Sequence, residues 1–447
     1  MGVALPGSAL RTPQAGFVLC LHRQYHKTVA KRFSQMHVLI IGAGLGGLTL
    51  AQTLRKRGIS YEVFERDEDE NGRFQGWAIA LHTYSIVDEF LSALPPDMPD
   101  LRESTNHLAP LDLRHQFAYY YGGREGCFGL EDSPDQPFIR AERSRLRKWL
   151  LTNILVQWSK TLTDIEQDEE GVTVRFKDGS SARGDIVVGA DGVHSPARQH
   201  LLKRPSSDLL HVVPLMAIVG ELDLTGDAFK RQLELGHCAY NLINPELGFI
   251  GFVGVHYVFP DGNGGRLYWM FMQPDTADID ITDATHWLQT SSAQEKLDHV
   301  KKTAAGLSPR LREIFELTPV EGVRKEPHIW RDLELESLPT GRVALLGDAA
   351  HAMTPSRGEG AFQAFIDAMK LSKMLAKLST EDRFKDINAV QAGVAEYHSE
   401  MLQRGTAAVR RSRSSYQDAK KRSETGEHFT SGMKPLAIEP VVLAATG

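Results

Sequence analysis

The stretch from Met36 to Glu65 constrains the fold most, because strand, glycine turn, helix, strand and acid follow one another there. The apolar run His37–Ile41 has the length and branching of a buried strand. The turn Gly42–Gly47 satisfies G-x-G-x-x-G, and the helix after it stops at Gly58, a left-handed cap position. A second strand then ends at Glu65. This order predicts a dinucleotide-binding unit.

Each glycine of the motif has its own physical role. Gly42 lets the chain turn tightly, Gly44 lets backbone approach a pyrophosphate, and Gly47 lets the helix lie close to the strand. The helix N-terminus offers N–H groups and partial positive charge to that pyrophosphate. Glu65 lies where a ribose-binding acid is expected, and its carboxylate would repel a 2′-phosphate. The motif therefore fits FAD or NAD and not NADP; the alternative is a purely structural glycine-rich turn.

Bulk composition narrows the classes of partner. The 447 residues can bury a large core and predict two domains. Lys+Arg 51 against Asp+Glu 57 gives a net charge of −6, which calls for neither nucleic acid nor an anionic membrane. No apolar run approaches the length of a membrane span. Cys20, Cys127 and Cys238 form no C-x-x-C, so reduced thiols and a cytoplasmic location are expected, and no metal site is expected.

Residues 1–35 stand apart, because they contain Arg and Lys but no Asp or Glu. That composition resembles a mitochondrial transit peptide. The preferred interpretation is a disordered leader or non-native extension, because the first strand begins directly at Met36.

Two positions in the middle of the first half leave alternatives open. Arg143 stands at the start of an amphipathic helix, where a cation opposes the helix dipole; an anion nearby or an ordinary salt bridge would explain it. Asp191 follows the apolar strand 185–189, where open α/β sheets place ligand contacts. The alternative is a capped helix with Asp191 or Ser195 as N-cap. A hairpin is expected around residues 177–180.

Residues 206–325 have a different sequence pattern from the residues before them. Apolar runs at 211–222, 238–243, 248–259 and 266–273, joined by Gly, Pro, Asn and Asp, predict an antiparallel sheet followed by helices. A β-rich insert that covers a nucleotide domain is a natural place for a substrate pocket. Tyr240, on one of these strands, is a guess for a catalytic residue, with simple packing as the alternative.

A second strong motif lies at 342–368. A buried strand is followed by Asp348, and a tight turn leads through Gly360 and Ala361 into a helix. These small residues let the helix start approach a flat ring, and its dipole would stabilise negative charge on that ring. His351 is interpreted as a satisfied loop histidine in preference to a catalytic one. The tail, about 386–428, is expected to be a helix followed by a solvated basic stretch.

Three motifs in order resemble the group A FAD-dependent aromatic hydroxylases, the family of p-hydroxybenzoate and salicylate hydroxylases, and especially its fungal secondary-metabolite branch. They are GAGLGG at 42–47, GADGVHSPAR at 189–198 and LGDAAHAMTPSRGEGA at 346–361. The resemblance implies that Glu65 binds the adenosine ribose, Arg143 contacts the cofactor, and Asp191 touches FAD and the arriving nicotinamide. It further implies that Asp348 binds the ribityl chain, that Gly360 and Ala361 lie against the isoalloxazine, and that Ala78 nears FAD. Glu359 departs from the family, where many members carry Gln.

The implied fold is α/β: a Rossmann-like FAD domain (36–205 and 326–380), an inserted antiparallel substrate domain (206–325), and a C-terminal helix and tail (381–447). The implied reaction uses NADH or NADPH and O2 to hydroxylate or epoxidise an aromatic, polyketide or terpenoid-like molecule through a flavin C4a-hydroperoxide. With no second G-x-G-x-x-G, the nicotinamide is expected to dock transiently near Asp191 and Arg198. A monomer or homodimer is expected. An FAD oxidase or reductase, and a non-enzymatic binding protein, are the rival functions.

Overall fold

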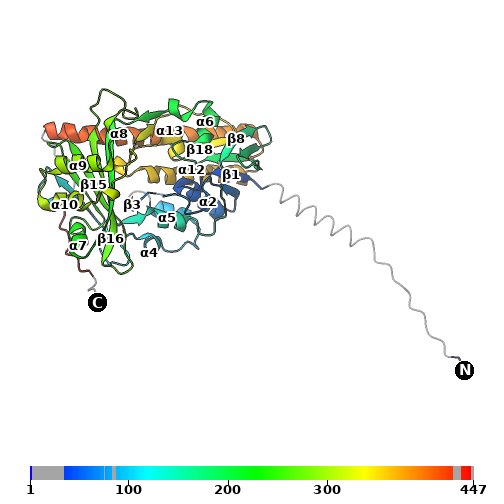
Figure 1. The fold of residues 1–447 in the computed structure, drawn as a ribbon. Helices are drawn as coiled ribbons and strands as arrows, with labels where there is room; N and C mark the ends of the chain where they lie inside the picture. Colours follow the sequence, from blue (N-terminus) through cyan, green and yellow to red (C-terminus); the bar gives the residue numbers. More distant parts are fainter. Residues whose placement is uncertain (3–34, 75, 83–86, 426–433, 444–447) are drawn as a thin grey trace.

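The structure is a computed structural model that describes residues 1–2, 35–74, 76–82, 87–425 and 434–443 (Figure 1). The expected leader, except for its first two residues and its last, lies outside the described residues. Cys20 lies outside them as well. The sequence also predicts a helix that begins at Thr83 and stops before Pro95, and its first residues lie outside the described residues. The described part of that helix, α3 (Asp88–Ala93), ends before Pro95 as expected.

The first motif builds the centre of a parallel sheet. Among the described residues its strand order is β18-β11-β1-β2-β7, and every neighbouring pair is parallel. This arrangement confirms the Rossmann-like prediction. The strands are β1 (His37–Ile41), β2 (Ser60–Phe64), β7 (Val156–Gln157), β11 (Ile186–Gly189) and β18 (Val343–Leu345).

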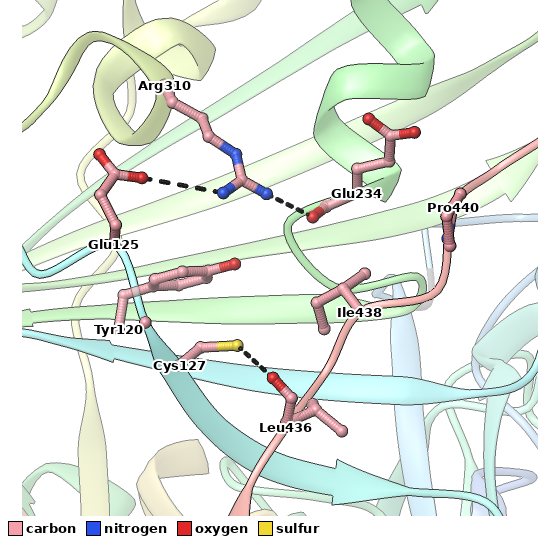
Figure 2. Close-up of a pocket in the computed structure, with 9 residues that line it drawn as sticks. Tyr120, Glu125, Cys127, Glu234, Arg310, Leu436, Ile438 and Pro440 are labelled. Carbon is pink, nitrogen blue, oxygen red and sulfur yellow. Dashed lines mark hydrogen bonds and ion pairs between the residues drawn. The ribbon is translucent and has the colours of Figure 1, made fainter.

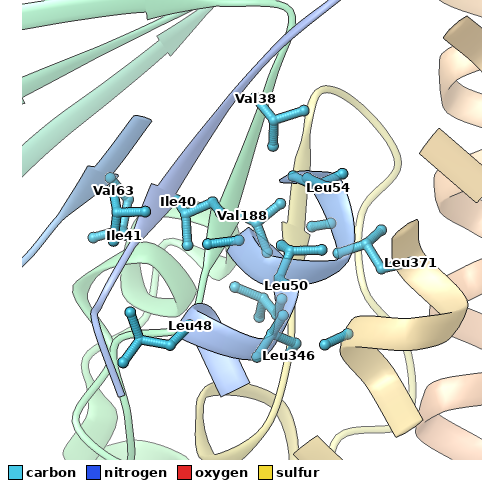
Figure 3. Packing of buried hydrophobic residues seen from close by; sticks show 14 of the residues in the cluster. Val38, Ile40, Ile41, Leu48, Leu50, Leu54, Val63, Val188, Leu346 and Leu371 are labelled. Atoms are coloured by element: carbon cyan, nitrogen blue, oxygen red, sulfur yellow. The ribbon is translucent and has the colours of Figure 1, made fainter. Parts of the chain in front are cut away.

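Two helices that begin at glycine turns pack against one another beside this sheet. Helix α2 (Leu45–Arg57) follows β1, and α12 (Gly360–Thr380) lies between α2 and the long helix α13 (Ile387–Thr425) (Figure 1). Leu48, Leu50 and Leu54 of α2 bury their side chains in the core shared with the strands and α12 (Figure 3). Burial of such side chains supplies about 1.5–3 kcal/mol each.

A second sheet forms the other half of the molecule. Within the described part of the chain its order is β13-β16-β15-β14-β4-β5-β19. Helices α7, α9 and α10 cover one face, and their apolar residues share a core with that face. The elements are β4 (Gln116–Tyr121), β5 (Cys127–Glu131), β13 (Leu215–Thr225), β14 (Ala239–Asn244), β15 (Phe249–Val258), β16 (Gly264–Pro274), β19 (Lys434–Pro435), α7 (Gly226–Leu233), α9 (Ala293–Ala304) and α10 (Pro309–Leu317).

The second sheet is not a single insert. Residues 206–325 provide β13 to β16, as expected, but β4 and β5 come from a region assigned to the FAD domain, and β19 comes from the tail. Strand β4 pairs parallel with β14, more than a hundred residues further along the chain. The sequence could not reveal this pairing, because strand propensity does not identify a partner.

The junction between the halves is a two-stranded ribbon. Strand β3 (Ala78–His82) pairs with β6 (Phe138–Glu142), which runs directly into α5 (Arg143–Leu150). The amphipathic pattern continues to Leu155, but the helix ends earlier and the Leu155 side chain is 91% exposed. The sequence pattern predicts that the apolar side of this helix reaches Leu155, and the exposure of that side chain shows this prediction to be wrong.

The basic stretch of the tail belongs to α13 itself. Arg413 pairs with the buried carboxylate of Asp332 at 2.6 Å, and Arg410 pairs with Glu334 at 2.8 Å. This part of α13 is therefore docked through ion pairs, and the expected solvated face is present beside them, since the Arg410 side chain is 70% exposed. None of the helices in the described residues is long and apolar enough to cross a membrane.

Smaller elements complete the fold. Strands β9 and β10 form the hairpin expected around residues 177–180. The remaining elements are α4 (Leu101–Thr105), α6 (Pro196–Leu202), α8 (Trp287–Thr290), α11 (Asp348–His351), β8 (Leu162–Gln167), β9 (Val172–Phe176), β10 (Ser181–Gly184), β12 (Leu210–Val212), β17 (Arg331–Leu333), and the 3₁₀ turns η2 (Ser206–Asp208), η3 (Val320–Gly322) and η4 (Pro355–Arg357).

Candidate cofactor and substrate site

The glycine turn after β1 has two positions that accept no side chain and one that is open. Gly42 has φ +108°, and a Cβ there would lie 2.4 Å from the Ala190 carbonyl oxygen. A Cβ on Gly47 would lie 2.0 Å from the Gly42 carbonyl oxygen. A Cβ on Gly44 would meet nothing within 4 Å, and no side chain caps α2. The turn is thus closed towards the protein and open in front of the helix N-terminus, which suits a pyrophosphate.

Glu65 lies at the carboxyl end of β2 and is 4% exposed. One of its oxygens accepts a hydrogen bond from the Ala43 N–H at 2.7 Å, and the other accepts from the Asp67 N–H at 3.1 Å. The carboxylate is thereby held rigidly against the glycine turn. Each oxygen keeps a second lone pair, which can accept a ribose hydroxyl.

Arg143 and Asp348 lie in one region although they come from distant segments. The half-buried Arg143 side chain packs against Gly76, where a Cβ would lie 3.2 Å from its Cδ. Burial lowers the pKa of the Arg143 guanidinium, and the Asp348 carboxylate opposes that shift. Across the described residues the guanidinium has no hydrogen-bond partner. A guanidinium in that state fits the polar edge of a bound cofactor and does not fit the salt-bridge alternative.

The N-terminus of α12 is open as well. The N–H groups of Gly360 and Ala361 have no partner in the described part of the chain. Further along this first turn, the Gln363 N–H donates to the Glu359 carbonyl. A Cβ on Gly360 would meet only Met353, at 3.8 Å. Gly46 of α2 approaches Ala364 of α12 closely, since a Cβ there would lie 3.2 Å from the Ala364 Cβ. Two open helix starts therefore lie side by side, as an extended dinucleotide requires.

A cluster of aromatic side chains faces this region from the second sheet. Trp77, next to Ala78, stacks on Tyr268 with centroids 4.6 Å apart and planes 7° apart. Arg140 donates a hydrogen bond to the Tyr268 hydroxyl and lies 5.0 Å from the Phe252 ring centre. Ala78 itself contributes its carbonyl oxygen, which accepts from Arg140 at 3.3 Å. At the interface between the halves, flat apolar rings are thus packed against one another with a cation beside them.

A histidine–carboxylate pair lies at the same interface. His256, on a bulge of β15, places Nε2 3.2 Å from Glu142 Oε1. Its Nδ1 is buried and has no partner among the described residues. With Nε2–H donating to Glu142, Nδ1 carries a free lone pair, which is how an oriented general base is arranged. Sequence reasoning missed this pair, because His256 belongs to no motif and lies 114 residues from Glu142.

Comparison with known proteins identifies the family. A family model described as an FAD binding domain matches residues 144–412, and an NAD(P)-binding Rossmann-like domain matches residues 40–87. The FAD-dependent monooxygenase thnD of Trichoderma harzianum is 53% identical over 410 residues, which cover 92% of this chain and 100% of that protein. The chain belongs to the FAD-dependent monooxygenases. This finding confirms the family and the cofactor FAD, and it sets aside the non-enzymatic binding protein.

Solved structures show the same fold as this monooxygenase. The 2,6-dihydroxypyridine-3-hydroxylase of Arthrobacter nicotinovorans has a TM-score of 0.65 at 18% identity, covering 92% of this chain and 99% of that one. HpxO of Klebsiella pneumoniae, solved with FAD and uric acid, has a TM-score of 0.63 at 22% identity, covering 88% of this chain and 95% of that one.

Asp191 of the monooxygenase caps a helix. Its carboxylate accepts hydrogen bonds from the Ser195 hydroxyl at 2.5 Å and the Ala197 N–H at 2.9 Å, and burial raises its pKa. Ser195 is the N-cap of α6, and it accepts from the Arg198 N–H. The capping alternative therefore describes the Asp191 side chain. The predicted contact of Asp191 with FAD stays a prediction; Gly192, the next residue, has φ +85°, and a Cβ there would meet nothing within 4 Å.

Arg198 does not present its guanidinium to a ligand. It is fully buried and donates to the Ala349 carbonyl at 3.0 Å, the Val193 carbonyl at 2.7 Å and the Ser206 hydroxyl at 2.7 Å. Both terminal nitrogens of Arg198 are therefore engaged within the protein, and docking of the nicotinamide near Asp191 and Arg198 stays a prediction. The residue ties α6 to α11.

Tyr240 has a packing position. Its buried hydroxyl donates to Gln232 Oε1 at 2.6 Å, and burial raises its pKa well above the usual value. In register, Tyr240 pairs with Val253 and Val253 with Trp269, so Tyr240 shares the helix-covered face with Trp269. Tyr268 is on the opposite face, towards Trp77. This placement favours packing over the guessed catalytic role.

The expectation of a satisfied His351 is confirmed only in part, because its buried Nδ1 has no hydrogen-bond partner among the described residues. His351 is 1% exposed, and its Nε2 lies 2.7 Å from Asp367 Oδ2. The same carboxylate accepts from the Gly347 N–H at 2.8 Å, and its other oxygen accepts from Arg404 at 2.7 Å. Asp367 thus fixes the turn that carries Asp348.

One buried trio has the residue types of a metal site. The ligand atoms of His107, His115 and Cys238 lie within 4.8 Å of one another. Both ring nitrogens of His115 are already hydrogen-bonded, one to the Arg140 N–H and the other to Asn106 Oδ1. Arg140 also places positive charge nearby, so the trio does not have the character of a cation site.

A cavity of about 410 Å³ lies at the far edge of the second sheet, between β5 and the C-terminal segment (Figure 2). Cys127 donates to the Leu436 carbonyl at 3.3 Å, and Arg310 donates to the Glu234 carbonyl at 2.7 Å. The first contact holds the C-terminal segment against β5, and the second joins α10 to the end of α7.

Proposed function

We propose that this monooxygenase uses NADH or NADPH and O2 to hydroxylate or epoxidise an aromatic or polycyclic small molecule bound between the two halves of the molecule. The aromatic cluster of Trp77, Phe252 and Tyr268, next to the His256–Glu142 pair, is the observation that supports it. Flat apolar walls suit a planar substrate, and few polar groups fix its orientation.

The proposed cofactor contacts follow from the open groups of the first half. Gly42, Gly44, Gly47 and the α2 N-terminus would hold the pyrophosphate, and Glu65 the ribose. Arg143, Asp348, Ala78 and the backbone of the Asp191 loop would line the flavin half. Gly360 and Ala361 would present their N–H groups to the ring. When bound, FAD supplies the redox chemistry, taking reducing equivalents from the nicotinamide and activating O2.

His256 is the proposed substrate-side base. Glu142 orients the ring through Nε2–H, which leaves Nδ1 to accept a proton from a substrate hydroxyl. Removal of that proton makes an aromatic ring more electron-rich and thus easier to oxygenate. The surrounding rings of Phe74, Trp77 and Tyr268 exclude water from the site.

Stoichiometry tests the proposal. FAD-loaded protein is incubated with candidate aromatic compounds, and NAD(P)H loss, O2 loss and hydroxylated product are measured together. A hydroxylase consumes NAD(P)H and O2 and forms hydroxylated product in equal amounts. Substrate-stimulated O2 consumption that yields only hydrogen peroxide would indicate an oxidase instead.

A cytoplasmic location is also proposed. Cys127 and Cys238 are free thiols, as a reducing compartment implies. Fractionation of cells that produce the full chain checks this, and enrichment in mitochondria would contradict it.

A further inference from the structure

Two glutamates occupy the same position at the start of two helices and behave differently. Glu142 is the N-cap of α5, and its carboxylate accepts from the Ser144 N–H at 3.0 Å and the Arg145 N–H at 2.7 Å. Glu359 is the N-cap of α12, yet its side chain makes no capping hydrogen bond. Their backbones differ as well: Glu142 is extended (φ −64°, ψ 128°), as a capping residue usually is, whereas Glu359 is helical (φ −84°, ψ −17°). The attraction of a carboxylate to a positive helix end acts on both residues, and at Glu359 other partners oppose it.

Two arginines hold it. Arg357 Nε donates to one carboxylate oxygen of Glu359 at 2.6 Å, and Arg411 donates to the other at 2.8 Å. Arg411 comes from α13, and its neighbour Ser412 donates to the Thr354 carbonyl at 2.7 Å. The C-terminal helix is therefore fastened to the loop before α12 at two adjacent residues.

The charges agree with this geometry. Partial burial would raise the pKa of Glu359, but the hydrogen bonds from Arg411 and Arg357 lower it, so the group is ionised at neutral pH. Released from the arginines, that negative charge would lie at the N–H groups of Gly360 and Ala361. It would compete there with any electron-rich ligand atom.

We propose that Arg357 and Arg411 are positioning residues that hold Glu359 off the N-terminus of α12, so that the helix N–H groups and positive dipole act on bound flavin. This inference rests on the proposed placement of the flavin against Gly360 and Ala361. It also accounts for a glutamate at a position where a carboxylate would otherwise oppose reduced, anionic flavin.

A double-mutant cycle tests the proposal on the full chain. FAD dissociation constants and the two-electron reduction potential of bound FAD are measured for wild type, R411Q, E359Q and R411Q/E359Q. R411Q should weaken FAD binding about tenfold and lower the potential, because Glu359 is then held by Arg357 alone and its other carboxylate oxygen turns towards the helix start. E359Q should raise the potential, because two arginines remain without their carboxylate. The double variant should regain wild-type FAD affinity.

The matched control is R410Q, which removes an adjacent, 70% exposed arginine that pairs with Glu334. It should change neither quantity. The proposal is overturned if R411Q leaves both unchanged, or if the double variant binds FAD as weakly as R411Q. A wild-type protein that takes up no FAD would instead contradict the proposed cofactor contacts.

Discussion

At the scale of single residues, identical amino acids have opposite roles according to what surrounds them. Gly47 is closed in by the Gly42 carbonyl, whereas Gly44 faces open space. Glu142 caps its helix, and Glu359 is drawn away from its own. Sequence motifs identify such positions but not the surroundings that decide their roles.

The two glycines give a prediction that separates folding from binding. Gly47→Ala should lower the melting temperature of the protein without cofactor, because its Cβ overlaps the Gly42 carbonyl at 2.0 Å. Gly44→Ala should leave that temperature within about 2 °C of wild type, because surface changes cost little. It should nevertheless weaken FAD binding, because a methyl group enters the pyrophosphate position. Thermal unfolding and FAD titration check both. Equal loss of stability in the two variants would contradict the open position of Gly44.

The proposed base gives a second prediction at this scale. His256→Gln should reduce kcat for product formation about 100-fold, a typical contribution of general base catalysis. NAD(P)H oxidation should continue but yield less product. The control is His299→Gln on α9, which covers the other face of the same sheet and pairs with Gln273 at 2.6 Å. Wild-type product yield from His256→Gln would exclude the proposed role.

At the scale of elements, the buried pair between α11 and α12 carries the turn of the second motif. Burial alone would lower the pKa of His351, but the Asp367 carboxylate raises it above the usual 6.5. A group whose pKa is raised by folding stabilises the folded state fully at pH values below its pKa in the unfolded chain. This stabilisation is lost as the pH rises through its pKa in the folded state. His351 thus stabilises the α11–α12 contact more in acid than in alkali.

The upward direction of this pKa shift predicts a measurable pH dependence of the unfolding free energy. The unfolding free energy of wild type should exceed that of His351→Gln by the largest margin below about pH 6.5, and the margin should shrink as pH rises. Denaturant titrations across this range check it. A margin that is constant with pH would show that the pKa of His351 is the same in the folded and unfolded states.

At the scale of the whole molecule, the C-terminal segment 434–443 is part of the fold. The C-terminal segment adds β19 to the second sheet, and its Val441 is fully buried in that sheet's core. Helix α13, which precedes it, packs on the first half. The last sixty residues therefore link both halves, although the sequence marked them only as a helix and tail.

Adjacent valines test this link. Val441→Ala should cost about 1–3 kcal/mol of unfolding free energy, because a buried side chain is truncated. Val442→Ala, 85% exposed, should cost less than about 0.5 kcal/mol. Equilibrium unfolding of the two variants decides. Equal effects would mean that the segment does not join the core.

The sequence determined the parallel sheet, the glycine turns and the family, because strand, turn and helix signals act between near neighbours. The confirmed elements β1, α2, β2, β11 and β18, and the start of α12, all follow from such local patterns. Local patterns also placed most strands of the second sheet.

Only the tertiary structure decided which side chains meet. His256 contacts Glu142 across 114 residues, and Arg411 contacts Glu359 across 52. It also showed that the Asp191 carboxylate caps α6 and that Arg198 donates to acceptors within the protein, and it placed Tyr240 on the helix-covered face. The physical reason is that burial, partner choice and strand order arise from contacts between distant segments, and these contacts leave no periodic signal in the chain.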